Sequence, residues 1–418
     1  MFLSRSTNSS ISFEGRLSLM AIFLTLSTGK WGSWIGVPNS PFFLIDLIVI
    51  LASLLSFLKI IKEQAPLSLH SLVLISFIIV QLVRNQEYSI VTKIRDISPF
   101  FYLFLVPFLA YSLRSVSFSH TIRVLRYACA INLLIFYLTT FGMLSPFDCG
   151  AICGTEIFHY RSDHVGLASC IGLMAWGKFS EQGIKSQPLV QIIFVLGLLI
   201  NQSRAGLFGL FLVILFFIVP QFMLNSKRNR LKIRTATLLT LGLSVAVIIL
   251  NSSQTRLIGF ERLTQESVSQ QISGNTDGTT RARVIAQGLV LNYVFNVKKQ
   301  YVWGVGAGDE MVRDSGAYRY LSGAVEVRAP HNWFVGLLAR YGIIGFLFWV
   351  FIFGKFYSKP RGKDSIALLI KVSILVLLAL SAFGVMMESP FGALPFAYFL
   401  ALGLRYSGSR RALGGQFD

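Results

Sequence analysis

Residues 187–224 read QPLVQIIFVLGLLINQSRAGLFGLFLVILFFIVPQFML, which is two apolar runs joined by a short polar turn. Each run is long enough for a helix that crosses a hydrocarbon core about 30 Å thick. Because only the residues NQS separate the runs, the two helices must form a tight hairpin with Arg204 at its tip. This stretch therefore predicts membrane-spanning helices.

The same pattern recurs along the chain. The 418 residues are 54% hydrophobic and only 14% charged, whereas a soluble protein carries roughly a quarter charged residues. An all-α polytopic membrane protein is expected, and the first span would itself direct insertion because no signal-peptide cleavage pattern precedes it. About twelve spans are predicted, near 17–36, 41–58, 68–84, 97–113, 123–142, 164–179, 187–202, 205–224, 235–251, 332–355, 365–386 and 390–405.

The basic residues predict the orientation of these spans. The net charge is +19. The connections after even-numbered spans carry more Lys and Arg residues than the other short connections, and basic residues hold loops in the cytoplasm. Both termini are therefore expected in the cytoplasm. Arg84, Lys93 and Arg95 depart from this pattern. Since no basic stripe interleaved with exposed aromatic residues is visible, nucleic-acid binding is not expected.

This topology divides the chain into residues 1–251 with spans one to nine, a periplasmic loop at 252–330, and residues 331–418 with spans ten to twelve. A loop of this length usually has a function of its own. Its stretch ARVIAQGLVLNYVFNV, residues 282–297, has apolar residues at helical spacing and predicts an amphipathic helix on the membrane surface.

The four cysteines give no sign of a metal site. Cys129 and Cys170 lie in apolar runs, where packing is the expected role. Cys149 and Cys153 share the polar segment CGAIC, where a disulfide and two free thiols are equal alternatives. No CxxC pair or Cys/His cluster is present, so no metal and no cofactor are predicted.

Arg204 permits two interpretations. It could be an anchor whose charge reaches the membrane interface. It could instead hold phosphate, because the following helix begins at the same tip and its free N–H groups and positive dipole end point the same way.

A second candidate lies in RAPHNWFVGLLARYGIIGFLFWVF, residues 328–351. His331 and Asn332 stand where the long loop meets span ten. Histidine is the side chain best suited to move a proton near neutral pH, although a lone histidine at an interface is more often structural. Arg340 lies about 13 Å further along the helix and needs a partner or a watery cavity there.

The third candidate is the pair Arg281 and Arg283, followed by WGVGAGDE at residues 303–310. The glycine pattern predicts a tight turn rather than a dinucleotide loop, because no strand precedes it. The candidate residues are several arginines and one histidine, with few paired acids. This set does not suit a hydrolase or a metal site. It suits a diphosphate whose charge is held as it leaves and a base acting on a hydroxyl.

At these residues the chain resembles the O-antigen ligase and O-antigen polymerase superfamily. The resemblance covers about residues 190–350 and rests on QSRAGLFGL, on TTRARVIAQGL ahead of WGVGAG, and on HNWFVGLLARYGIIGF. It implies a bacterial inner-membrane glycosyltransferase of the GT-C type that works without metal or nucleotide. Such enzymes take a glycan from undecaprenyl diphosphate on the periplasmic side. Ligases transfer it to a lipid A core sugar, and polymerases to a lipid-linked repeat unit.

The resemblance also implies roles for individual residues. Arg204 matches the hairpin arginine that binds the diphosphate, Arg281 or Arg283 matches the loop arginine with the same role, and His331 with Asn332 matches the acceptor side. The sequence departs from the family at Arg340, where relatives often have an acidic residue. The alternative is a lipid-linked oligosaccharide flippase or other transporter, which should carry its charges near the middle of the membrane. A purely structural subunit would leave the arginines without a role.

Overall fold

The computed structural model describes residues 10–36, 42–63, 69–148, 150, 156–201, 203–220, 280–321, 327–360, 364–384 and 386–414. Within these ranges all regular structure is helical, and only isolated β-bridges occur. Five of the described helices are long and apolar enough to cross a membrane. The expectation of an all-α, multi-pass membrane protein is confirmed at this level, while the number of twelve spans and the GT-C type stay predictions.

Helices overlie eleven of the twelve predicted spans, and the remaining span, 235–251, lies outside the described residues. The helices are α1 (Phe13–Ser33), α2 (Leu44–Lys62), α3 (Leu69–Val83), α4 (Ile90–Ser112), α5 (Phe118–Thr140), α6 (Ser162–Ala175), α7 (Pro188–Asn201), α8 (Arg204–Val213), α14 (Trp333–Tyr357), α15 (Ser365–Ala382) and α16 (Pro390–Gly414). Cys129 and Cys170 are buried free thiols as expected, whereas Cys149 and Cys153 lie outside the described residues.

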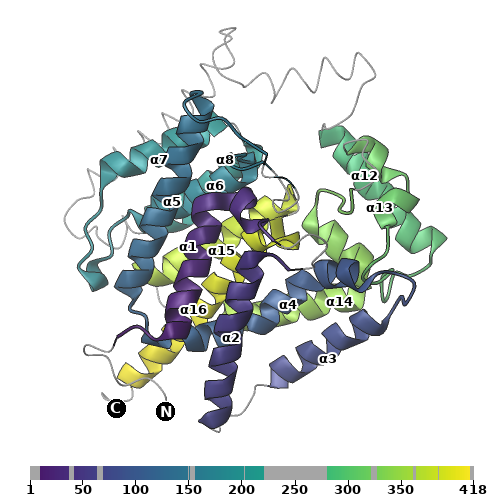
Figure 1. The fold of residues 1–418 in the computed structure, drawn as a ribbon, viewed down its shortest axis with the longest axis horizontal. Coiled ribbons are helices and arrows are strands. Elements are labelled where there is room, and N and C mark those ends of the chain that lie inside the picture. The colour runs from purple at the N-terminus through teal and green to yellow at the C-terminus, as the bar shows by residue number, and fades with distance from the viewer. Residues whose placement is uncertain are drawn as a thin grey trace.

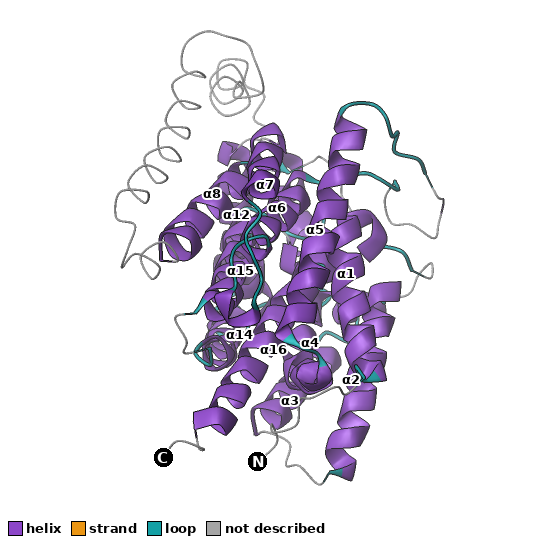
Figure 2. Ribbon diagram, turned by 90° about the vertical axis from the view of Figure 1, so that its left-hand side faces the viewer, coloured by secondary structure: helices purple, strands orange, loops and turns teal. Residues whose placement is uncertain are grey.

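Polar contacts join helix ends at one end of the bundle. Lys59 Nζ lies 2.7 Å from Glu14 Oε1, which joins the end of α2 to the start of α1. Arg114 donates two hydrogen bonds to Glu63, at 2.8 and 3.1 Å, and so joins the ends of α4 and α2. The end of α16 lies at this same end of the molecule (Figures 1 and 2). These contacts bring the start of α1 and the ends of α2 and α4 together, while the orientation of the spans in the membrane stays a prediction.

The outer helices present apolar side chains outward. On α2, Leu47, Leu51, Leu54 and Leu58 recur at spacings of three and four residues and are each about half exposed. Such a stripe would be unfavourable in water and suits a hydrocarbon surface. In contrast, α6 and the first part of α16 are buried almost throughout and form the centre of the bundle.

A small helical unit lies beside the bundle, at the right in Figure 1. It contains α12 (Thr280–Asn292), the π-turn η5 (Tyr293–Val297), α13 (Met311–Asp314) and the 3-10 turn η6 (Ala317–Tyr320). The predicted helix is therefore present. Its apolar residues Ala286, Val290 and Val294 pack against Met311 and Ala317. The chain turns back so that α13 and η6 pack on this face of α12. Protein therefore covers the apolar face, which is not available to the membrane surface.

The turn WGVGAG is built into a break in α14. The helix is interrupted at Gly342, where φ is 64° and ψ is −170°. A broken helix leaves backbone groups without partners, which must be satisfied by protein. Four backbone hydrogen bonds of 2.7–3.2 Å do this: Val305 N to Ala339 O, Gly306 N to Arg340 O, Ile343 N to Tyr301 O and Ile344 N to Val302 O.

Glycine is required in this turn. Gly304, Gly306 and Gly308 all have positive φ, at 67°, 91° and 95°, a region that other residues rarely adopt. A Cβ on Gly304 would also lie only 2.4 Å from the carbonyl of Arg340. The predicted tight turn is confirmed, and its function in the fold is to hold the two halves of α14.

Candidate active site

The starts of α6 and α8 lie side by side. A Cβ added to Gly166 would lie 3.1 Å from Gly206 Cα, so the two backbones approach as closely as glycine permits. Asn201, at the end of α7, donates its side-chain amide to Ser162 O at 2.6 Å. The hairpin tip that carries Arg204 is therefore fixed against the start of α6.

An ion pair stands at the start of α6. Arg161 Nη2 lies 2.9 Å from Asp163 Oδ2, and the two side chains are 30% and 12% exposed. A Cβ on Gly384, which follows α15, would lie 3.6 Å from the same carboxylate oxygen. Arg283 of α12 donates from Nη1 to the neighbouring Phe383 O at 3.3 Å. Three segments far apart in sequence thus bring two arginines and one aspartate together.

His331 faces this cluster from the residue pair that precedes α14. Its backbone has a φ of 54°, in the left-handed region, and its side chain is half-buried. Burial lowers the pKa of His331 to about 4, and the positive charges of Arg283 and Arg161 lower it too, while Asp163 opposes them. The imidazole is therefore uncharged at neutral pH and is able to accept a proton.

Asn332 caps α14. Its side-chain oxygen accepts hydrogen bonds from Phe334 N at 3.0 Å and Val335 N at 3.3 Å, which satisfies two of the free N–H groups at the helix start. This cap fixes the backbone beside His331. The acceptor-side role predicted for Asn332 stays a prediction, and its observed contacts are structural.

Of the two loop arginines, Arg283 is the one whose side chain the structure describes. Arg281 and Arg283 lie two positions apart on α12, which separates them by about 200° around the helix axis. The side chain of Arg283 reaches Phe383 O. The side chains of Arg281 and Arg204 lie outside the described part of the structure, although Arg204 begins α8.

Comparison with known families decides what this arrangement resembles. Residues 189–350 match the family model of the O-antigen ligase. The match covers the hairpin, α12, the glycine turn and the first part of α14, so the resemblance inferred from the sequence is confirmed. It implies a membrane glycan ligase or polymerase of the glycosyltransferase type. No curated protein matches the chain.

The matched residues 189–350 include Arg204, Arg283 and His331, but the candidate site also contains residues outside this range. Arg161 and Asp163 were not predicted, and neither was Lys30, on which their charges act. The segment RSDH at 161–164 carries a signal, since an acid and two basic groups stand at the start of an apolar span. Within the described residues no group of three or more metal-ligating side chains occurs.

The buried Arg340 has the partner that its depth requires. Its Nη2 lies 3.5 Å from Asp96 Oδ1 and donates to Arg328 O at 2.8 Å. Arg328 in turn lies 2.9 Å from Asp96 Oδ2, which also accepts from Gly308 N at 2.8 Å. This network ties α4 to the glycine turn and to the segment that leads into His331. These contacts hold the glycine turn and the segment before His331 in place.

Two of the three basic residues that depart from the topology pattern, Arg84 and Lys93, donate hydrogen bonds to backbone oxygens. Arg84 donates to Trp303 O and Gly304 O, both at 2.8 Å. Lys93 Nζ donates to Leu82 O at 3.0 Å and to Arg84 O at 3.2 Å. These two charges therefore serve the glycine turn and the end of α3, which explains why they need not follow the distribution of basic residues in loops.

Proposed function

We propose that the protein transfers a glycan from undecaprenyl diphosphate to an acceptor sugar at the periplasmic face of the bacterial inner membrane. The observation that carries this proposal is that His331 lies within electrostatic reach of Arg161 and Arg283, beside the starts of α6 and α8. The orientation follows from the basic connections, with both termini cytoplasmic and residues 252–330 periplasmic. Neither metal nor cofactor takes part in the reaction as proposed.

The cations would hold the diphosphate of the donor. Arg283 comes from α12, Arg161 from the residue before α6, and Arg204 from the first position of α8. An arginine fork binds phosphate oxygens through paired hydrogen bonds. The positive ends of the α6 and α8 dipoles add to this attraction. Negative charge grows on the diphosphate as it leaves, so these groups stabilise the transition state most strongly.

His331 would serve as the general base. The acceptor hydroxyl oxygen forms a bond to the anomeric carbon of the donor, and a ring nitrogen of His331 takes the hydroxyl proton. The bond between the anomeric carbon and the diphosphate breaks, and the diphosphate keeps the electron pair. The negative charge of the bound donor offsets Arg161 and Arg283, so donor binding should raise the pKa of His331 and strengthen the base.

A flippase or other transporter is the alternative function. Transporters often contain broken helices, and both α1 and α14 are broken, at Gly29 and Gly342. Both breaks are filled by protein groups. A Cβ on Gly29 would lie 2.3 Å from His164 Nδ1, and the glycine turn fills the break in α14. The charges assigned to the donor, on Arg161, Arg204 and Arg283, lie at the starts of helices, which favours an enzyme.

Deletion of the gene followed by analysis of surface glycan tests this proposal and separates its two forms. Loss of polymer from lipid A with polymer retained on undecaprenyl diphosphate indicates an O-antigen ligase. Single repeat units on lipid A indicate a polymerase, for which the acceptor is a lipid-linked repeat unit. Repeats trapped in the cytoplasm would contradict both and indicate a flippase.

A further inference from the structure

The end of α1 packs against the segment that leads into α6. The Tyr160 hydroxyl donates a hydrogen bond to Ser27 O at 3.0 Å. The α1 helix breaks at Gly29, where φ is 62°, and a Cβ added there would lie 2.3 Å from His164 Nδ1. The break therefore needs glycine both for its conformation and for this close approach. Together the two contacts bring the next residue, Lys30, beside the start of α6.

Lys30 adds a second cation beside Arg161. The charges of Arg161 and Asp163 both act on its ammonium group, and Asp163 Oδ2 already pairs with Arg161 Nη2 at 2.9 Å. Among the described residues, no carboxylate lies within ion-pair distance of the Lys30 ammonium. Two like charges repel each other unless an anion lies near both. The arrangement therefore leaves positive charge that a bound anion would neutralise.

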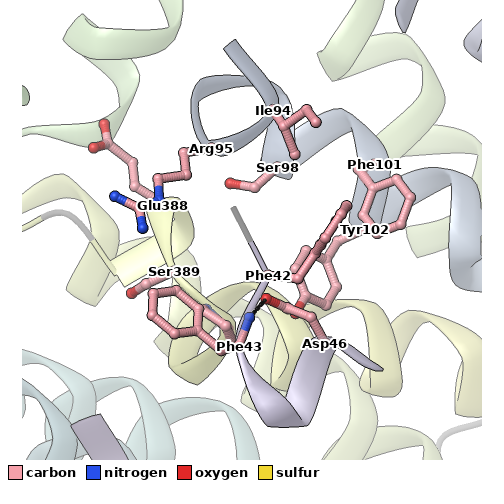
Figure 3. A pocket seen from close by; sticks show the side chains of 11 residues that line it. Phe42, Phe43, Asp46, Ile94, Arg95, Ser98, Phe101, Tyr102, Glu388 and Ser389 are labelled. Atoms are coloured by element: carbon pink, nitrogen blue, oxygen red, sulfur yellow. Dashed lines mark hydrogen bonds between the residues drawn. The ribbon is translucent and has the colours of Figure 1, made fainter. Parts of the chain in front are cut away.

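Aromatic rings hold the Lys30 side chain in place. Its Nζ lies 4.1 Å from the centroid of the Trp34 ring, about one helical turn further on. The Trp34 ring stacks on Phe43 with 6.1 Å between the centroids, and Phe43 also lines the small pocket in Figure 3. A ring face attracts a cation without accepting all three N–H donors of an ammonium group. The Lys30 ammonium is therefore positioned and keeps donors for a ligand.

A membrane anchor is the other interpretation of Lys30, because a lysine near the end of a span can extend to the interface. Lys355, in the last turn of α14, fits that description. It is exposed, and its Nζ lies 5.2 Å from the centroid of the Phe351 ring. Lys30 is less exposed than Lys355, and it lies within electrostatic reach of Arg161 and Asp163. An anchor gains nothing from a neighbouring cation, so this difference favours anion binding.

The negative charge of the diphosphate grows during the proposed transfer. In the donor, each phosphate carries about one charge. After the bond to the glycan breaks, the terminal phosphate carries close to about two charges at neutral pH. Of the described cations of the site, Arg161 is already paired with Asp163, whereas Arg283 contacts only a carbonyl oxygen in the contacts described above. Lys30 supplies a further positive charge where negative charge develops, which is where it stabilises the transition state.

We propose that Lys30 binds the donor diphosphate together with Arg161 and stabilises the diphosphate as it leaves. The assignment rests on the proposed function, because it names a further residue of the same donor site. Lys30 and Arg161 both lie outside residues 189–350, the range of the family match. The donor site therefore extends to α1 and to the start of α6.

Substitutions at Lys30 separate its charge from its packing. Lys30→Met and Lys30→Gln remove the charge and keep a long side chain, while Lys30→Arg keeps the charge. Lys355→Met is the matched control, because Lys355 also lies over a ring four residues away.

The full-length purified protein is used throughout, and thermal unfolding checks each variant. Binding is measured in detergent micelles for undecaprenyl diphosphate and for undecaprenol, which has the same tail and no phosphate. Transfer from purified lipid-linked donor gives kcat, with deacylated lipid A core oligosaccharide and, separately, a short soluble repeat unit as acceptor.

Both neutral variants should weaken the binding of undecaprenyl diphosphate by about tenfold, the effect of one lost hydrogen bond to a charged group. They should also lower kcat and leave the binding of undecaprenol unchanged. Lys30→Arg should stay within about threefold of the wild type because it keeps the charge, and Lys355→Met should match the wild type.

Three results would overturn the assignment of Lys30 while leaving the proposed transfer intact. They are unchanged affinity for undecaprenyl diphosphate in a folded neutral variant, an equal loss for undecaprenol, and a loss in Lys30→Arg as large as in Lys30→Met. Absence of transfer by the wild type to either acceptor overturns the proposed function, and the assignment of Lys30 with it.

Discussion

The structure contains two arginine clusters, and they differ in how their arginines contact the carboxylate. In the first, Arg328 and Arg340 converge on Asp96, and Arg340 also donates to Arg328 O. In the second, Asp163 pairs with Arg161, while Arg283 donates to Phe383 O at a longer 3.3 Å. We call the first cluster closed, because both of its arginines contact the carboxylate. We call the second open, because Arg161 contacts its carboxylate and Arg283 contacts a carbonyl oxygen.

This difference teaches how to tell a supporting arginine from a binding one. Arg340 is 4% exposed and lies within a broken helix, where a charge persists only with a partner. Arg161 is 30% exposed at a helix start, where solvent or an anion can reach it. The sequence shows five arginines near three motifs, and only the packing separates the two groups.

The largest expected effect is the loss of transfer activity when His331 is replaced, because His331 is the proposed base beside the open cluster. His331→Ala and His331→Gln should each reduce transfer by about 10²–10⁴-fold, since neither side chain accepts the hydroxyl proton. Binding of the lipid-linked donor should remain. Near wild-type transfer by His331→Gln would mean that the histidine positions the acceptor, and Glu326, which lies outside the described residues, would become the next candidate base.

The next effect is on stability and should be confined to the closed cluster. Asp96→Asn leaves Arg340 without its counter-charge, which costs about 3–5 kcal/mol for a buried pair. Asp163→Asn should cost about 1 kcal/mol or less, because its partner Arg161 is partly exposed. Thermal unfolding of the two purified variants measures the difference. Equal melting temperatures would show that the two clusters do not differ as described.

Arg204 belongs to the open cluster only if it binds phosphate. Arg204→Lys should lose most transfer activity while the protein inserts normally, because lysine lacks the fork that binds two phosphate oxygens. Arg114→Lys, in the Glu63 pair at the opposite end, is the matched control and should retain activity. Full activity in Arg204→Lys would leave only the membrane-anchor interpretation for this residue.

The smallest expected effect is on the pH profile. The pKa of His331 lies at about 4, so the free enzyme keeps its base deprotonated well below the usual histidine value near 6.5. Arg283→Gln removes a positive charge, so the pKa should rise and the base should be lost at a higher pH. In the pH profile of kcat/KM, the acid limb of the variant should move to a higher pH. If the acid limb of the variant does not move, the charge of Arg283 does not act on His331.

Features formed by residues close together in the sequence could be predicted from it. Contacts between residues far apart in the sequence could not. The hairpin at Arg204, the helix over 282–297 and the turn at 303–308 follow from polar breaks, apolar spacing and glycines that lie within a few residues of one another. The partner of Arg340 is Asp96, which is 244 residues away by number. Arg161 and Asp163 join the site only because Gly166 and Gly206 bring α6 and α8 into contact.

The most direct test of the open cluster is the affinity of the purified protein for undecaprenyl-diphosphate-linked glycan, compared between Arg283→Lys and Arg328→Lys. Each variant keeps the positive charge and changes only the fork, so the difference isolates phosphate recognition. Arg283→Lys should weaken donor binding by about tenfold, and Arg328→Lys should leave the Kd within about twofold of the wild type. Equal affinities in the two variants, or a larger loss in Arg328→Lys, would contradict the assignment of the donor to the cluster at His331.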